Sequence, residues 1–535
     1  MHLFHVSLGG GISGTQSLLS LVDKITTINK KRKLNKKITL AVVEKDPKNI
    51  PGGVAYGFDK CFFGFFNNPL RLSPDKFTRW VLKNKNRLLL IDYLNKYGGH
   101  TGKQWIRDNK NILFSKNKKD LNELYIPRAM MHFWMQEKLI LCLDKINKVK
   151  NLIQIKFFKG EVESIIKNKD YYELKFKKNF CEELNHKILK DKFNRIVFDK
   201  KNKISKKLFS KNLNIGLGLP PPAQIATYSA QKNKNYVWDF YEKGSTDYLI
   251  KRISNFSNKK KPIMIYFVGY KAGLLEALPE LSKRIINEKI NVKIICSSRE
   301  LQSIQKAELS LGKKKYRTKY FKRDQLYKID TAEKLYYSIL KEFKFSMVQG
   351  YNKYDAWTFI LKNNLIFYLI KKFNINEKKR YDDFFHSKIR GVTRFTYPET
   401  INAREFLSKR KILIAKKEKV SSIDVINDKL IVTAKNKRSS VQKYKCDIVI
   451  NVSGPLNAEK IKKEVPLIYN LKKMGALTIS GNLVVSNFFE IKGLNNIYIP
   501  GILARGFNPE RKTLINAILG NCNLVANSIS RTISE

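Results

Sequence analysis

The stretch HLFHVSLGGGISGTQSLLSLV, residues 2–22, decides how the rest of the chain is arranged. Its first seven residues alternate as a short buried strand does, and apolar residues recur at helical spacing after residue 12. The pattern G-x-G-x-x-G lies between them. The first glycine allows a tight turn, the second lets the backbone approach a pyrophosphate, and the third allows close packing of helix on strand. The stretch predicts a dinucleotide-binding turn whose candidate residues are Gly9, Gly11, Ile12, Ser13 and Gly14.

An acidic residue at the end of the next predicted strand supplies the second half of this signal. The run ITLAVVE, residues 38–44, reads as a buried parallel strand that ends in Glu44. A carboxylate at this place would accept hydrogen bonds from ribose hydroxyls and repel a 2′-phosphate, so the turn suits FAD or NAD rather than NADP. Glu44 lies farther beyond the glycines than the usual spacing of about 20 residues, because the polar run 30–37 lengthens the loop. The alternative is a strand-end acid that merely faces water.

The length and the net charge of the chain limit the number of domains and the kinds of partner to be considered. A chain of 535 residues should hold two or more domains. Its net charge of +58, from 104 basic and 46 acidic residues, could indicate a nucleic acid or an anionic membrane as partner. The lysines are spread along the whole chain, however, and many accompany Asn and Ile. We interpret them as a compositional bias of the source genome, with association with RNA or another polyanion as the alternative.

Cysteine usage and hydropathy indicate neither a metal centre nor a membrane span. The histidines are scattered, and no two cysteines form a C-x-x-C pair. The N-terminus lacks the basic region and cleavage site of a signal peptide, and no apolar run reaches about 18 residues. We therefore expect a cytoplasmic protein. The cysteines are Cys61, Cys142, Cys181, Cys296, Cys446 and Cys522.

The segment 45–80 follows Glu44 directly and is rich in glycine, proline and aromatic residues. It should leave the sheet at the carboxyl edge, where ligands bind in doubly wound folds. We expect part of it, residues 52–80, to border the flavin ring, with Tyr56 and Asn67 as candidate contacts. The alternative is an ordinary aromatic loop that covers a core.

Three pieces of sequence resemble one family. GGVAYG (52–57), NNPLRLSPDKFTRW (67–80) and YIPRAMMHFWMQEKL (125–139) are similar to segments of the FAD/NAD(P)-binding flavoproteins related to N-hydroxylating and other flavin-dependent monooxygenases. The resemblance implies that a Gly-x-Val strand passes the adenine and that glycines end several later strands near the cofactor. An Asp that many FAD enzymes carry after the last of these glycines is absent, because Ile502 stands there. The resemblance implies Val162, Gly218, Gly454 and Gly501 as further FAD contacts.

A second strand–turn–helix begins at PIMIYFVGYKAGLL, residues 262–275. Its first glycine is present, but a lysine replaces the second, so the motif is degenerate. The next strand, NVKIICSSRE (291–300), ends in hydroxyls and a guanidinium that could receive a 2′-phosphate. We expect NADPH here, with a domain retained only for packing as the alternative. The candidate residues are Gly269, Lys271, Gly273, Ser298 and Arg299.

These features predict an α/β fold. A Rossmann-like FAD-binding domain of three ββα layers, residues 1–235 and 401–535, should be interrupted by a second NAD(P)-binding Rossmann-like domain with a helical insertion, residues 236–400. The expected function is that of an FAD-dependent oxidoreductase, a monooxygenase in which NADPH reduces FAD and the reduced flavin activates O₂ toward a small substrate. No catalytic side chain can be named. The alternatives are a flavoprotein associated with RNA and a flavin-binding protein without turnover.

Overall fold

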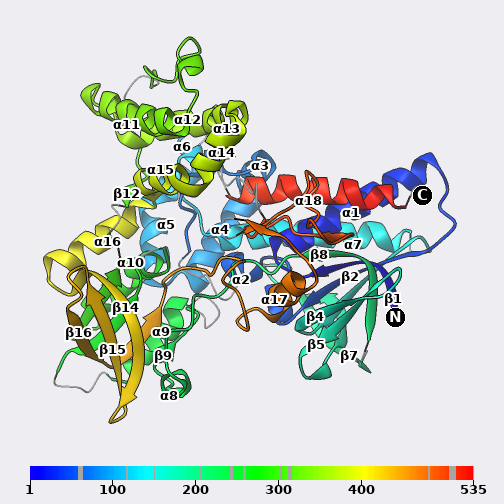
Figure 1. The fold of residues 1–535 in the computed structure, drawn as a ribbon, viewed down its shortest axis with the longest axis horizontal. Helices are drawn as coiled ribbons and strands as arrows, with labels where there is room; N and C mark the ends of the chain where they lie inside the picture. Colours follow the sequence, from blue (N-terminus) through cyan, green and yellow to red (C-terminus); the bar gives the residue numbers. More distant parts are fainter. Residues whose placement is uncertain are drawn as a thin grey trace.

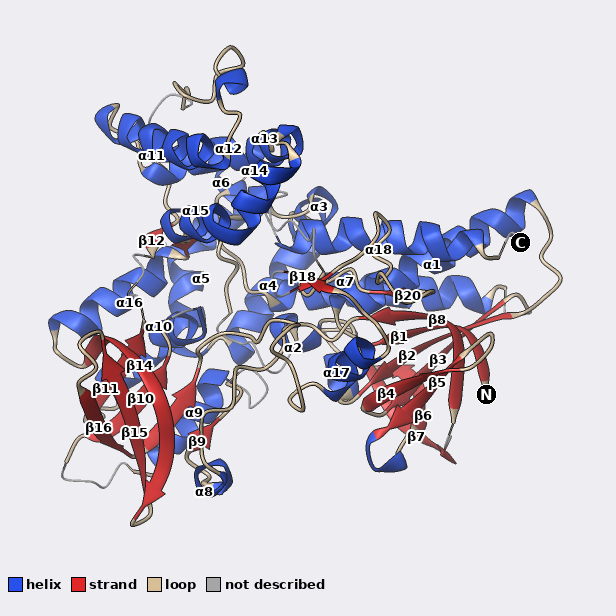
Figure 2. Ribbon diagram, in the orientation of Figure 1, coloured by secondary structure: helices blue, strands red, loops and turns tan. Residues whose placement is uncertain are grey.

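The computed structural model has two large sheets, each with helices against it, and a separate group of helices beyond them (Figure 1). Figure 2 shows the two sheets in separate lobes, with the two chain termini at the lobe that holds β1. The structure describes residues 1–57, 64–115, 118–149, 151–204, 207–240, 245–256, 261–270, 272–299, 301, 304–310, 316–479, 482–504 and 514–533.

The first sheet has nine strands in the order β4-β5-β8-β1-β2-β3-β6-β7, and β20 pairs with β8. Its centre is parallel: β1 lies between β2 and β8, and β2 also pairs in parallel with β3. The strands are β1 His2–Leu8, β2 Ile38–Glu44, β3 Ile153–Lys159, β4 Val162–Lys167, β5 Tyr172–Phe176, β6 Glu182–Ile188, β7 Ile196–Ile204, β8 Leu208–Ile215 and β20 Ile497–Tyr498. The last strand thus rejoins the first sheet from the far end of the chain, as expected.

Helix α1 (Ile12–Lys31) follows the glycine turn and runs beside α18 (Leu514–Arg531) and α7 (Ala129–Asn147) on one side of this sheet (Figure 1). Its apolar residues Leu18, Val22 and Ile25 are buried, which explains why an amphipathic sequence forms a helix here. This part also contains the helices α2 Gly53–Tyr56, α3 Asp75–Val81, α4 Asn84–Tyr97, α5 Gly99–Phe114, α6 Lys118–Asn122 and α17 Pro466–Lys473. Strand β18 (Thr478–Ile479) pairs in antiparallel with β19 (Asn482–Leu483).

The second sheet has seven strands in the order β16-β15-β14-β11-β10-β17-β9. Strand β10 lies in parallel between β11 and β17, which repeats the arrangement of β1 in the first sheet. The strands are β9 Tyr236–Val237, β10 Ile263–Val268, β11 Val292–Ser298, β14 Leu413–Ile426, β15 Lys429–Asn436, β16 Val441–Cys446 and β17 Ile448–Asn451. Helices α9 Ser245–Ser254, α10 Ala272–Asn287 and α16 Pro398–Lys409 share its core, and the short helix α8 Tyr228–Lys232 lies beside β14.

The prediction that the chain returns to the first sheet at residue 401 is wrong. Strand β14 pairs with β11, and β17 pairs with β10, so residues 413–451 belong to the second sheet. An apolar strand such as β17 carries no mark of which parallel sheet it will join, and only its pairing decides this. The chain rejoins the first sheet through α17, which lies against β4, and then through β20.

The expected helical insertion is present between two short paired strands, β12 (Gln305–Lys306) and β13 (Phe395–Thr396). It has its own apolar core, in which Leu335, Phe343 and Trp357 are buried. Its helices are α11 Ala332–Val348, α12 Lys353–Lys362, α13 Leu365–Lys372, α14 Ile375–Arg380 and α15 His386–Val392. Among the helices that the structure describes, none is long and apolar enough to cross a membrane.

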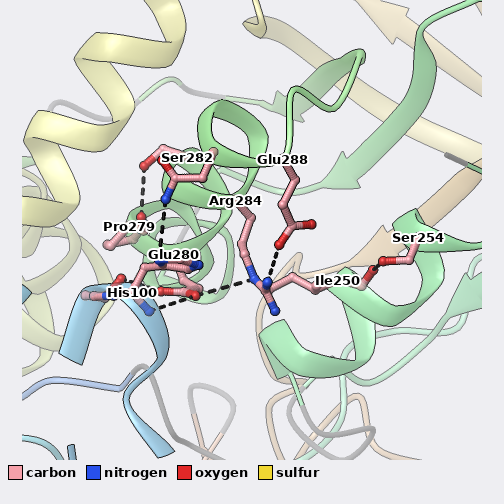
Figure 3. A network of polar contacts seen from close by, with 10 residues as sticks. His100, Ile250, Ser254, Pro279, Glu280, Ser282, Arg284 and Glu288 are labelled. Carbon is pink, nitrogen blue, oxygen red and sulfur yellow. Dashed lines mark hydrogen bonds and ion pairs between the residues drawn. The ribbon is translucent and has the colours of Figure 1, made fainter. Parts of the chain in front are cut away.

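A buried carboxylate joins the two lobes. Glu280, on α10 of the second lobe, accepts hydrogen bonds from the backbone N–H groups of His100 (3.2 Å) and Thr101 (2.8 Å) and from the Thr101 hydroxyl (2.8 Å). These donors form the N-terminus of α5 in the first lobe. Figure 3 shows Arg284 between Glu280 and the more exposed Glu288. One turn earlier on α10, Glu276 pairs with Arg128 at the start of α7. The helix after the second turn is thus attached to the first lobe at two points.

Candidate functional site

The first glycine turn draws three strand ends together. The Gly9 N–H donates to the carbonyl of Val43 at the end of β2 (2.8 Å), and the Gly216 N–H after β8 donates to the carbonyl of Leu8 (2.7 Å). Gly9 has φ +100°, and a Cβ on it would overlap the Gly216 carbonyl. The turn therefore requires glycine at this position for its backbone conformation and for space.

The folded chain explains the other two glycines of the motif, Gly14 and Gly11, to different degrees. A Cβ on Gly14 would overlap the Gly9 carbonyl, so glycine is needed there to pack α1 against the turn. Gly11 has φ −69°, which any residue adopts, and a Cβ on it would lie 3.2 Å from the Cα of Gly53. The folded chain alone therefore explains the glycines at 9 and 14 better than the one at 11. A ligand that approaches the backbone at 11 would supply the missing reason.

The start of α1 is arranged to accept an anion. Gly11 caps the helix without a side-chain hydrogen bond, and the first turn, Ile12-Ser13-Gly14, contains no acid. The first N–H groups of a helix have no intrahelical acceptor and carry a partial positive charge. This geometry fits a pyrophosphate.

Glu44 is part of the turn itself. Its Oε2 accepts a hydrogen bond from the Gly10 N–H (2.7 Å), and its Oε1 accepts from the Asp46 N–H (3.1 Å) and the Asn49 side-chain amide (3.3 Å). The residue is buried, so the alternative of an acid that merely faces water is wrong. A carboxylate oxygen has two lone pairs, which leaves Oε2 able to accept a second hydrogen bond, as from a ribose hydroxyl.

Three further candidates of the first site, Val162, Gly218 and Gly501, lie at or near the same sheet edge. The Gly160 N–H donates to the Glu44 carbonyl (3.1 Å), which places Val162, at the start of β4, beyond the end of β2. No described atom lies within 4 Å of a Cβ built on Gly218 or on Gly501. Open space at glycines that follow β8 and β20 is what a bound cofactor would need.

The structure places Tyr56 and Asn67 in different surroundings. Tyr56 ends α2, three residues after Gly53, and so lies close in sequence to the residue that faces the turn. Asn67 accepts a hydrogen bond from the Thr396 hydroxyl (3.2 Å), at the base of the helical insertion. The prediction that residues 52–80 border a flavin ring stays a prediction. Part of that segment, residues 58–63 with Cys61, lies outside the described residues.

The second turn repeats the construction of the first. The Gly269 N–H donates to the carbonyl of Ser297 (2.8 Å), as Gly9 does to Val43, and Gly269 has φ +119°. A Cβ on Gly269 would lie 2.6 Å from the carbonyl oxygen of Val452, just as one on Gly9 would meet Gly216. Since Ser297 corresponds to Val43, Ser298 takes the place of Glu44. The position that would repel a 2′-phosphate in the first turn thus carries a hydroxyl in the second.

The other candidates of the second turn are only partly placed. Ser298 is half-buried and Arg299 is exposed at the end of β11, and Gly273 lies in the first turn of α10. Lys271, which replaces the second glycine, lies outside the described residues. Gly454, expected at the FAD, follows β17 and therefore ends a strand of the second sheet, where its φ is +103°.

Sequence reasoning missed a buried polar group beneath the first turn. His5 and Ser7 of β1 stand opposite Asn212 and Asn214 of β8, and all four are fully buried. The Ser7 hydroxyl donates to the Gly14 carbonyl (3.2 Å). Burial lowers the pKa of His5 to about 3, so its imidazole is neutral near pH 7. The sequence does carry a signal of this group, because polar residues occupy alternate positions of β1, a strand that should be apolar on both faces.

No protein-family model matches the chain, and no curated protein matches its sequence. Solved structures match its fold over nearly the whole length. The ornithine N-hydroxylase of Kutzneria sp. 744, described with reduced FAD, NADP⁺ and L-orn, is 11% identical with a TM-score of 0.52, over 99% of this chain and 100% of that one. The ornithine hydroxylase of Pseudomonas aeruginosa is 9% identical with a TM-score of 0.50, over 99% of both chains. The FAD-bound cadaverine monooxygenase of Erwinia amylovora is 10% identical with a TM-score of 0.50, over 99% and 94%.

At these identities the likeness is one of fold. The chain has the two-sheet α/β fold of FAD/NAD(P)-dependent oxidoreductases, among them flavin-dependent N-hydroxylating monooxygenases, and the predicted fold class is confirmed. The structures it resembles are described with FAD and with NADP⁺.

Proposed function

We propose that the protein is an FAD-dependent monooxygenase that takes electrons from NADPH and acts on a small molecule. The observation that carries the proposal is the pair of equivalent turns with opposite chemistry at one position. Glu44 in the first turn favours a nucleotide with free ribose hydroxyls, and Ser298 in the second tolerates one with a 2′-phosphate. Two turns of this kind are what an enzyme that binds both FAD and NADPH needs.

Each part of the first site has a task in this proposal. The start of α1 holds the pyrophosphate, and Glu44 binds the adenosine ribose while fixing the Gly10 N–H. Leu217 and Leu219, which are 40% and 50% exposed on either side of Gly218, would cover the cofactor and exclude water. Bound FAD supplies the redox chemistry, and the protein supplies position and electrostatics.

The cysteines of the described regions favour chemistry at the flavin alone. Burial raises the pKa of each of these thiols to about 12, so none is a reactive thiolate near neutral pH. A mechanism that passes electrons through a cysteine pair has no support among them. They are Cys142, Cys181, Cys296, Cys446 and Cys522.

We expect the purified protein to bind FAD. Its absorption spectrum should show oxidised flavin, and mass analysis of the released cofactor should give FAD rather than FMN, because Glu44 is placed for an adenosine ribose. Apoprotein mixed with FAD and gel-filtered should retain the cofactor. Protein that stays colourless after this treatment would contradict the proposal.

Arg299→Ala should reduce the preference for NADPH over NADH. Arg299 follows Ser298, the last residue of β11, where its guanidinium could form charge-assisted hydrogen bonds with a 2′-phosphate. We expect a loss of about tenfold in the NADPH/NADH ratio, or about 1.4 kcal/mol. The measurement is anaerobic flavin reduction with each nucleotide. An unchanged ratio would place the phosphate elsewhere, and reduction by neither nucleotide would contradict the assigned electron donor.

A further inference from the structure

The end of β11 has a lysine beside it on the neighbouring strand. Strands β11 and β14 run in parallel with Ser298 opposite Lys417 and Ser297 opposite Lys416. Opposed residues point to the same face, and neighbouring strands lie about 4.8 Å apart. On this face, Cys296 and Leu413 belong to the core shared with α10, so Ser298 and Lys417 lie on the side of the sheet that carries the second turn's helix.

The equivalent pair of residues in the first sheet indicates which part of a bound nucleotide Ser298 and Lys417 would face. Glu44 stands opposite Lys159 of β3 in the same way that Ser298 stands opposite Lys417. The two pairs therefore occupy equivalent places, next to the ribose position of each turn. In the first sheet an acid lies beside the lysine, whereas in the second a hydroxyl lies there and Arg299 follows. An anion that the first site would repel is attracted by the second.

Lys417 is exposed, and no carboxylate of the described residues forms an ion pair with it. Its neighbour Glu418 points to the opposite face, where it is buried and accepts hydrogen bonds from the hydroxyls of Tyr266 (2.8 Å) and Tyr444 (2.9 Å).

We propose that Lys417 completes a phosphate site with Ser298 and Arg299, and that its ligand is the 2′-phosphate of an NADPH-type nucleotide. The inference rests on the proposed function and adds the residue from β14 that would set the preference. Lysine supplies a mobile point charge and serine a hydroxyl donor, and both suit a phosphate dianion. Lys417 belongs to strand β14 of the second sheet and not to the turn between β10 and α10.

The test measures nucleotide binding by calorimetry, without turnover. The FAD-loaded protein is titrated with adenosine 2′,5′-bisphosphate and with 5′-AMP, which differ only in the 2′-phosphate. Lys417→Met keeps the aliphatic stem and removes the charge, and Lys419→Met is the matched control two residues farther on the same face. Lys417→Met should weaken binding of the bisphosphate about tenfold and leave 5′-AMP binding unchanged, because only the 2′-phosphate meets Lys417. Lys419→Met should change neither by more than about twofold.

The outcomes separate this inference from the function on which it rests. Wild-type preference for the bisphosphate together with unchanged binding by Lys417→Met would overturn the role of Lys417 alone. Equal losses in the Lys417 and Lys419 variants would also overturn it, because a general charge effect would then suffice. Wild-type protein that does not prefer the bisphosphate would overturn both the phosphate site and NADPH as the electron donor. Circular dichroism verifies that both variants fold.

Discussion

We expect Gly11→Val to abolish FAD binding while the apoprotein still folds. This result is expected because the backbone at Gly11 has φ −69°, which valine adopts readily, and because a Cβ there would lie 3.2 Å from Gly53. The fold can accommodate that contact with a small shift. A pyrophosphate cannot approach the same backbone once a branched side chain occupies the space. We expect a loss of affinity of at least about 100-fold, or about 2.7 kcal/mol.

Two further substitutions separate binding from folding. Gly14→Ala should destabilise the apoprotein itself, because its Cβ would overlap the Gly9 carbonyl. Gly520→Ala, within α18, has no described atom within 4 Å of its Cβ and should stabilise by about 0.5–1 kcal/mol, the usual gain in a helix. FAD affinity by fluorescence quenching and apoprotein stability by urea titration should be measured for all three variants. Normal FAD binding by Gly11→Val would show that the motif serves only the fold.

The sequence predicts the centre of each sheet well and the assignment of later strands poorly. The first turn, Glu44 and the second turn could be recognised because glycine spacing and a strand-end acid are local patterns with a direct physical reason. Strand β17 could not be assigned, since its four apolar residues would suit either parallel sheet. The same limit explains why β14 was expected in the first sheet and why Gly454 was expected at the FAD.

The contacts between lobes could not be predicted from sequence at all. Glu280 reads as an ordinary polar residue of an amphipathic helix, and Gly99 as a turn glycine. Only the folded chain brings them together, so that a Cβ on Gly99, at φ +56°, would lie 2.6 Å from the Glu280 carboxylate. Such pairings depend on the relative position of two sheets, which no local pattern encodes. The equivalence of Ser298 and Glu44 likewise became visible only from the register of the two turns.

Glu280→Ala should cause the largest loss of stability among the substitutions considered. The carboxylate is 1% exposed and accepts three hydrogen bonds from the start of α5, where the helix dipole also favours a negative charge. Its removal leaves the half-buried N–H group of His100 and the buried N–H group of Thr101 without this acceptor, and Arg284 without one of its partners. Leaving a buried donor without its acceptor costs about 1–3 kcal/mol for each group. Urea titration followed by tryptophan fluorescence measures the loss.

Glu288→Ala provides the matched control. Glu288 directly follows the last residue of the same helix and pairs with the same Arg284, but at the surface, where a salt bridge contributes at most about 1 kcal/mol. Hydrogen exchange gives a local readout, because the Thr101 amide should lose protection in Glu280→Ala and keep it in Glu288→Ala. FAD binding should survive in both, since neither glutamate lies at the first turn. Reduction by NADPH should slow in Glu280→Ala alone, because α10, which begins at the second turn, would lose one of its two attachments to the first lobe. Equal stability and equal amide protection in the two variants would mean that the α5–α10 contact does not hold the lobes together.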